Sequence, residues 1–132
     1  MKEIKAVEPV YIEQYDINVN PCLTYAQIQQ IAEAVATSDS WAIRNQNIDM
    51  LIVYHATNID KDTIEELGHE TLLESGLIEV VRNNIRNLNQ VYEAIEYNES
   101  IQRSLTQIIK ALPKDLEPLE KVLKKYGNKV KE

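Results

Sequence analysis

The stretch from residue 77 to residue 112 contains neither glycine nor proline, and this feature restricts the possible folds more than any other. The whole chain of 132 residues has only 3 Gly and 4 Pro. Because glycine and proline are the residues that most often interrupt regular structure, their scarcity favours long helices over a turn-rich sandwich or barrel. Apolar residues in the stretch recur at spacings that alternate between three and four, as in a coiled coil, and therefore need a facing helix. They are Ile78, Val81, Ile85, Leu88, Tyr92 and Ile95.

The seam does not continue to the end of the stretch. Its next heptad positions are Glu99 and Gln102, while a new apolar stripe begins one position earlier in phase. That stripe comprises Ile101, Leu105, Ile108 and Leu112. The phase shift predicts a kink, or a helix that ends and restarts with Asn98 as its cap, and we favour the break. Beyond Pro113 the spacing of Leu116, Leu119 and Val122 predicts a last short helix ending near Gly127.

Two shorter helices are expected ahead of this stretch. Thr24 suits the N-cap of a helix over residues 25–35, whose apolar residues share one face. Either Asp39 or Ser40 can cap a second helix over residues 41–57. Trp41 at the start of that helix is either a core anchor or an interface residue, and the core is favoured.

A third short helix is expected between these two and the long stretch. Asp62 and Glu65 have the spacing of a capping box, so the helix should begin near Thr63. Gly76 suits the position just past its end. The predicted fold class is therefore mainly α: a bundle of five to six helices preceded by an extended or β-strand N-terminal arm.

The N-terminal segment differs from the rest of the chain because it has the period of a strand. Tyr11, Tyr15, Ile17 and Val19 share one parity, and polar residues occupy the other. Pro9 cannot donate to a ladder, and the residue before Pro21 avoids helical angles. We expect one domain over residues 1–132, with an extended arm over 1–21, a helical body over 22–127 and a charged tail over 128–132.

An extended arm needs a partner for its backbone groups, and no other segment has the pattern of a second strand. The arm either forms a hairpin-like clasp over the helices or is donated to another protein or subunit by β-augmentation. A run of asparagines on the outer side of the seam offers a second surface, although it can equally be a solvated face. The candidate partner-binding residues are Val10, Tyr11, Ile12, Tyr15, Ile17, Val19, Asn84 and Asn87.

No catalytic or metal-binding constellation is predicted. Glu66 and His69 have the Glu-x-x-His spacing of di-iron bundles, but only one copy is present, and His55 has apolar residues where carboxylates would be needed. Cys22 is the only cysteine, which is consistent with a cytosolic setting. We expect no enzyme activity and no cofactor.

Charge and hydropathy limit the partners. A net charge of -7 and a pI near 4.9 argue against direct binding of nucleic acid. The same acidity could let the chain imitate a nucleic acid toward a basic protein, or simply keep it in solution. The N-terminus lacks the apolar region of a signal peptide, and no stretch is long and apolar enough to span a membrane. A protein partner is expected.

Three short motifs occur in a recognisable order. They are VYIEQY over residues 10–15, YHATNI over 54–59 and ESGLIE over 74–79, the last leading into a long amphipathic helix. In this order the chain resembles small uncharacterised proteins encoded by bacteriophages and prophages, over roughly residues 7–112, and it departs from that pattern afterwards.

The resemblance implies a phage protein located in the host cytoplasm or the virion. It favours a non-catalytic structural or assembly protein, such as a virion, neck or tail component, that self-associates or binds other phage proteins. The alternative is an acidic inhibitor that binds a host defence protein such as a CRISPR effector.

Overall fold

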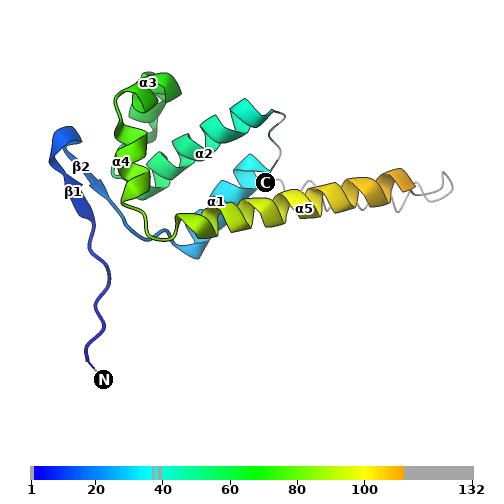
Figure 1. Cartoon of the computed structure of the whole chain (residues 1–132), viewed down its shortest axis with the longest axis horizontal. Coiled ribbons are helices and arrows are strands. Elements are labelled where there is room, and N and C mark those ends of the chain that lie inside the picture. The colour runs from blue at the N-terminus through cyan, green and yellow to red at the C-terminus, as the bar shows by residue number, and fades with distance from the viewer. Residues whose placement is uncertain (1, 37, 39, 112–132) are drawn as a thin grey trace.

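The computed structural model describes residues 2–36, 38 and 40–111, and it is mainly helical with a short pair of strands at the N-terminus (Figure 1). The predicted helix near residues 116–127 and the predicted charged tail lie outside the described residues. The elements are β1 (Val10–Ile12), a 3-10 turn η1 (Glu13–Tyr15), β2 (Ile17–Val19), α1 (Tyr25–Val35), α2 (Trp41–Ala56), α3 (Lys61–Glu74), α4 (Leu77–Asn83) and α5 (Leu88–Ala111). The predicted fold class is thus confirmed.

The N-terminal strand segment is a hairpin and not one continuous strand. β1 and β2 pair antiparallel, with Val10 opposite Val19 and Ile12 opposite Ile17. The chain reverses at Asp16, whose φ of 50° and ψ of 51° are left-handed and whose N–H donates to the Glu13 carbonyl. Aspartate adopts this conformation more readily than most residues. The alternation along residues 11–19 therefore belongs to two short strands whose backbone groups pair with each other.

The helix starts follow local capping chemistry. Thr24 and Gln27 form the full capping box of α1. The Gln27 N–H donates to the Thr24 hydroxyl oxygen at 3.1 Å, and the Thr24 N–H donates to the Gln27 side-chain oxygen at 3.0 Å. Ser40 caps α2 by accepting from the Ile43 N–H. Asp60 caps α3 by accepting from the Thr63 N–H at 2.8 Å, so the predicted start with Asp62 as cap was two residues late.

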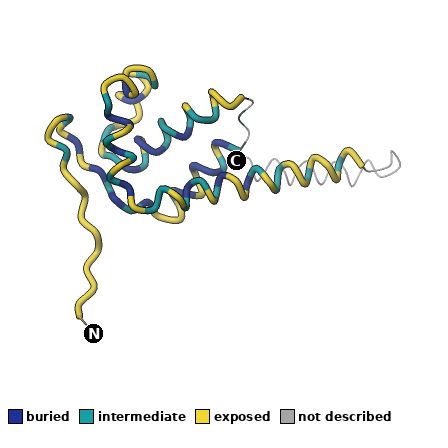
Figure 2. Tube along the Cα trace, viewed as in Figure 1, coloured by how far each residue is buried: buried dark blue, intermediate teal, exposed yellow. Residues whose placement is uncertain are grey.

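A single apolar core joins β2 to the helices. The buried segments gather where α1, α2, α4 and the first half of α5 meet (Figure 2). Ile31, Val35, Ile52, Val53 and Ile95 are completely shielded from solvent. Trp41 is 79% exposed, so its predicted place in the core was wrong. The described core is built from aliphatic side chains of all five helices and of β2.

The long glycine-free stretch breaks at residues 84–87, and the predicted break at Asn98 is wrong. The N–H of Arg86 donates to the Pro21 carbonyl at 2.7 Å, and the Asn87 side chain bonds both backbone groups of Leu23 at 3.0 and 2.9 Å. These contacts fix the turn between α4 and α5. Asn98 lies inside the continuous α5 and is only 4% exposed, because it faces the body of the molecule in the same row as Val91 and Ile95.

Candidate partner-binding surfaces

The hairpin residues predicted to bind a partner divide into buried and exposed sets. Ile17 and Val19 are 6% and 0% exposed and belong to the core, so they offer no surface to another protein. β2 also joins the body through its backbone, since the N–H of Asn20 donates to the Ala56 carbonyl at 2.7 Å. This part of the predicted arm is a clasp on the chain's own helices.

The outer half of the hairpin remains accessible. Val10 is 37% and Tyr11 is 57% exposed, while Ile12 is half-buried. The Tyr11 hydroxyl donates to an Asp16 carboxylate oxygen at 2.8 Å, and this bond raises the pKa of the tyrosine. The half-buried Tyr15 donates its hydroxyl to the Ser75 carbonyl and so holds the hairpin against the end of α3. Val10 and Tyr11 are the predicted hairpin residues that a partner can reach most readily.

The two asparagines predicted at the interface serve the chain itself. The Asn84 amide nitrogen donates to the Val80 carbonyl at 2.8 Å, one turn back. Asn87 connects Leu23 to the start of α5, as described above, and its Nδ2 also contacts Gln90 Oε1 at 3.2 Å. Their positions are explained by internal bonding without a partner.

Residues 2–9, called here the N-terminal arm, are all exposed and lead away from the body as an extended segment (Figure 1, Figure 2). Ile4 is 81% and Val7 is 44% exposed. Lys2 and Lys5 lie on the same segment. Glu3 and Glu8 also lie on it, so the arm presents apolar, cationic and acidic side chains together with an extended backbone.

A groove of about 450 Å³ lies between α1 and α5 and is called here the α1/α5 groove. Tyr25 and Tyr97 on its lining are 81% and 68% exposed, whereas Ile28 is buried beneath them. The described residues that line it are Tyr25, Ile28, Gln29, Gln90, Glu93, Ala94, Tyr97 and Asn98. Large exposed aromatic residues beside a hollow are typical of protein-binding surfaces.

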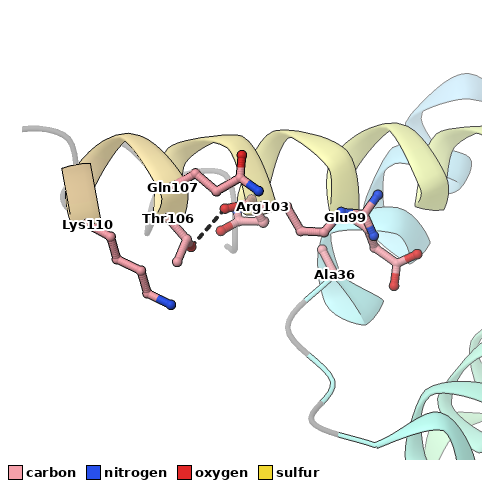
Figure 3. Close-up of a pocket in the computed structure, with 7 residues that line it drawn as sticks. Ala36, Glu99, Arg103, Thr106, Gln107 and Lys110 are labelled. Carbon is pink, nitrogen blue, oxygen red and sulfur yellow. Dashed lines mark hydrogen bonds between the residues drawn. The ribbon is translucent and has the colours of Figure 1, made fainter.

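A second depression, of about 430 Å³, runs beside the second half of α5 (Figure 3). Glu99, Arg103 and Lys110 supply its charges, and the Thr106 hydroxyl donates to the Gln102 carbonyl at 2.9 Å. No histidine or cysteine is among the described residues that line it. Its chemistry is that of a polar surface and not of a nucleophile paired with a base.

A chain of polar contacts joins four helices beneath the surface. Asp49 on α2 contacts His69 Nε2 at 3.0 Å and accepts from Arg82 Nη1 at 3.3 Å. Arg82 in turn donates to the Tyr92 hydroxyl at 2.7 Å. Among the described residues His69 thus pairs with Asp49 and makes no hydrogen bond to Glu66, the other member of the Glu-x-x-His spacing. Within the described ranges no group of three or more His, Cys, Asp or Glu residues could hold a metal ion.

A bidentate ion pair fastens α2 to α5. Arg44 donates to both carboxylate oxygens of Glu99, at 2.9 and 3.0 Å, which raises the pKa of the guanidinium. His55, further along α2, has a lowered pKa because burial disfavours its charged form. Arg44, Glu99 and His55 are all partly buried between packed elements.

Among the described residues of the helical body, most exposed acidic side chains lie on α3 or at its N-cap. These residues, called here the acidic face of α3, are Asp60, Asp62, Glu65, Glu66, Glu70 and Glu74. Lys61 offsets this charge only weakly, with its ammonium 3.8 Å from Glu65. The pKa of Asp60 is lowered by its hydrogen bond from the Thr63 backbone. A basic protein surface is the complementary partner for such a helix.

Comparison with protein-family models, with curated proteins and with solved structures found no match for this chain. In the part of the chain that the structure describes, no helix combines the length and the apolar character needed to cross a membrane.

Proposed function

We propose that this chain is a non-catalytic structural or assembly protein of a bacteriophage, and that it acts by donating its N-terminal arm to another copy of itself. The observation that supports this proposal is the arm of residues 2–9, which is exposed throughout and extended away from the body. The phage setting follows from the resemblance in the three sequence motifs.

The arm is poorly explained as part of an isolated chain. In the part of the chain that the structure describes, no strand pairs with its backbone, and Ile4 is 81% exposed to water. Docking on a second copy would shield the apolar side chains and give the backbone new partners. Because donor and receptor would be different parts of one chain, copies would add head to tail and could close into a ring.

Light scattering over a range of concentrations tests the proposal. The full chain should form a defined oligomer, and the chain lacking residues 2–9 should stay monomeric with unchanged helical circular dichroism. Replacing both Ile4 and Val7 by Ser should also weaken association, whereas Ala6→Ser in the same arm should not. An oligomer that persists after removal of the arm would contradict arm donation.

The acidic face of α3 favours a second candidate, an inhibitor that binds a basic host defence protein. Charge complementarity would then supply much of the association rate, and binding would weaken as salt increases. Titration of the chain against a candidate host effector by calorimetry tests this function. Changing Glu65, Glu66 and Glu70 to Gln should weaken binding at low salt, and unchanged affinity would rule out the acidic face.

A further inference from the structure

Asn98 is an unusual residue at the base of the α1/α5 groove. It is 4% exposed, and among the described residues its Nδ2 has no hydrogen-bond partner. A buried amide donor without an acceptor is costly, and an apolar side chain would suit the row of Val91 and Ile95 better. Since the last torsion of Asn rotates broadly, a small adjustment can present the nitrogen to an acceptor that enters the groove.

The groove also has the chemistry of a cation site. Glu93 is the only charged residue among the eight described residues that line it, and Tyr25 and Tyr97 present exposed rings. Aromatic ring faces and a carboxylate both attract an ammonium or guanidinium group. The buried Ile28 and the half-buried Ala94 supply an apolar patch beside the charge.

We propose that the α1/α5 groove is the receptor for the N-terminal arm of a second copy, with Lys5 against Glu93 and the tyrosines, Ile4 on the apolar patch, and an arm carbonyl bonded to Asn98. This inference rests on the proposed function, because it names the surface that receives the donated arm. The extended arm supplies each complementary element: a cation, an exposed apolar side chain and unpaired carbonyls. The arm points away from its own body, which favours docking on a neighbour (Figure 1).

A charge exchange tests the ion pair. Self-association of the full chain is measured by light scattering at low ionic strength for Lys5→Glu, for Glu93→Lys and for the chain with both changes. Each single change should weaken association by about fivefold to tenfold, because attraction becomes repulsion, and the double change should restore most of it. The control Glu66→Lys changes the net charge by the same amount as Glu93→Lys, but on α3, and should have little effect on association. Additive losses in the double variant would overturn the pairing.

Asn98→Leu separates a binding role from a packing role. The substitution is made in the chain lacking residues 2–9. Because it removes the unpartnered amide, it should leave the stability to urea unchanged or raise it. It should weaken the binding of a labelled peptide of residues 1–9 by about fivefold to tenfold. Unchanged peptide binding would remove Asn98 from the receptor.

A mixing experiment separates failure of this inference from failure of the proposed function. The chain lacking residues 2–9 keeps its groove, and the Glu93→Lys/Asn98→Leu chain keeps its arm. Neither should associate alone, and together they should form a one-to-one complex. If arm deletion abolishes association while the groove variant associates normally, arm donation stands and this groove is not the receptor. If the full chain is monomeric at every concentration and the peptide does not bind, both are overturned.

Discussion

Asn87 joins two parts of the chain that are 64 residues apart, because its amide bonds both the N–H and the carbonyl of Leu23. Asn87→Ala would leave these partly buried backbone groups without their partners, so the free energy of unfolding should fall by about 1–3 kcal/mol. Urea denaturation followed by circular dichroism measures the change. Asn89→Ala, at an exposed position two residues later in the first turn of α5, should be neutral or slightly stabilising. Equal effects of the two substitutions would show that the bridge contributes nothing.

His55 should make stability depend on pH. Its folded-state pKa lies below the ordinary histidine value of about 6.5, because burial disfavours the imidazolium. The unfolded chain therefore binds the proton more readily, so the contribution of His55 is complete above about pH 6.5 and declines as the pH falls through that value. His55→Gln should flatten the loss of stability between about pH 7 and pH 5 in urea titrations. The same slope in both proteins would assign the acid sensitivity to other groups.

At the scale of elements, Gly68 divides α3 into two helical segments. Its φ of 79° and ψ of 164° belong to a region that is essentially restricted to glycine. A Cβ at this position would meet nothing within 4 Å, so Gly68→Ala tests backbone strain without a steric clash. The substitution should lower the free energy of unfolding by about 1–3 kcal/mol. Glu66→Ala in the same helix is the control and should change stability by less than about 0.5 kcal/mol.

The elements that the sequence predicts best are those with local determinants. The capping box at Thr24 and the N-cap at Ser40 each involve residues three apart, and both predicted helix starts are correct. The break before α5 depends on Asn87 and Arg86 bonding to residues near position 22, which no local pattern reveals. Asn98 was predicted as a cap because the apolar seam fails at Glu99 and Gln102, yet it is buried against the body inside the continuous α5. Tertiary contacts decided both positions.

The candidate surfaces were predicted only in part. Alternation correctly placed Ile17 and Val19 on one face, but that face proved to be the core, because strand parity does not say what covers the strand. The α1/α5 groove was missed, since it combines Tyr25 with Tyr97 across 72 positions of sequence. The available signal was Asn98 on an otherwise apolar row of the long helix. A polar residue in such a row marks either a helix break or a site that needs an acceptor.

At the scale of the whole molecule, the N-terminal segment has two parts with different physical roles. The N-terminal arm is exposed throughout, whereas β2 adds Ile17 and Val19 to the core and bonds its backbone to the end of α2. The boundary between a part available for assembly and a part needed for folding therefore lies within the hairpin.

Two deletions should locate this boundary. Removing residues 2–9 takes away no buried side chain, so the free energy of unfolding and the dependence on urea should change little. Removing residues 2–19 opens the core by deleting the two buried aliphatic side chains Ile17 and Val19, each worth about 1.5–3 kcal/mol. That chain should unfold at much lower urea, with a broader transition, or fail to fold cooperatively. Equal midpoints for the two deletions would show that the clasp is dispensable and that the helices alone make the stable unit.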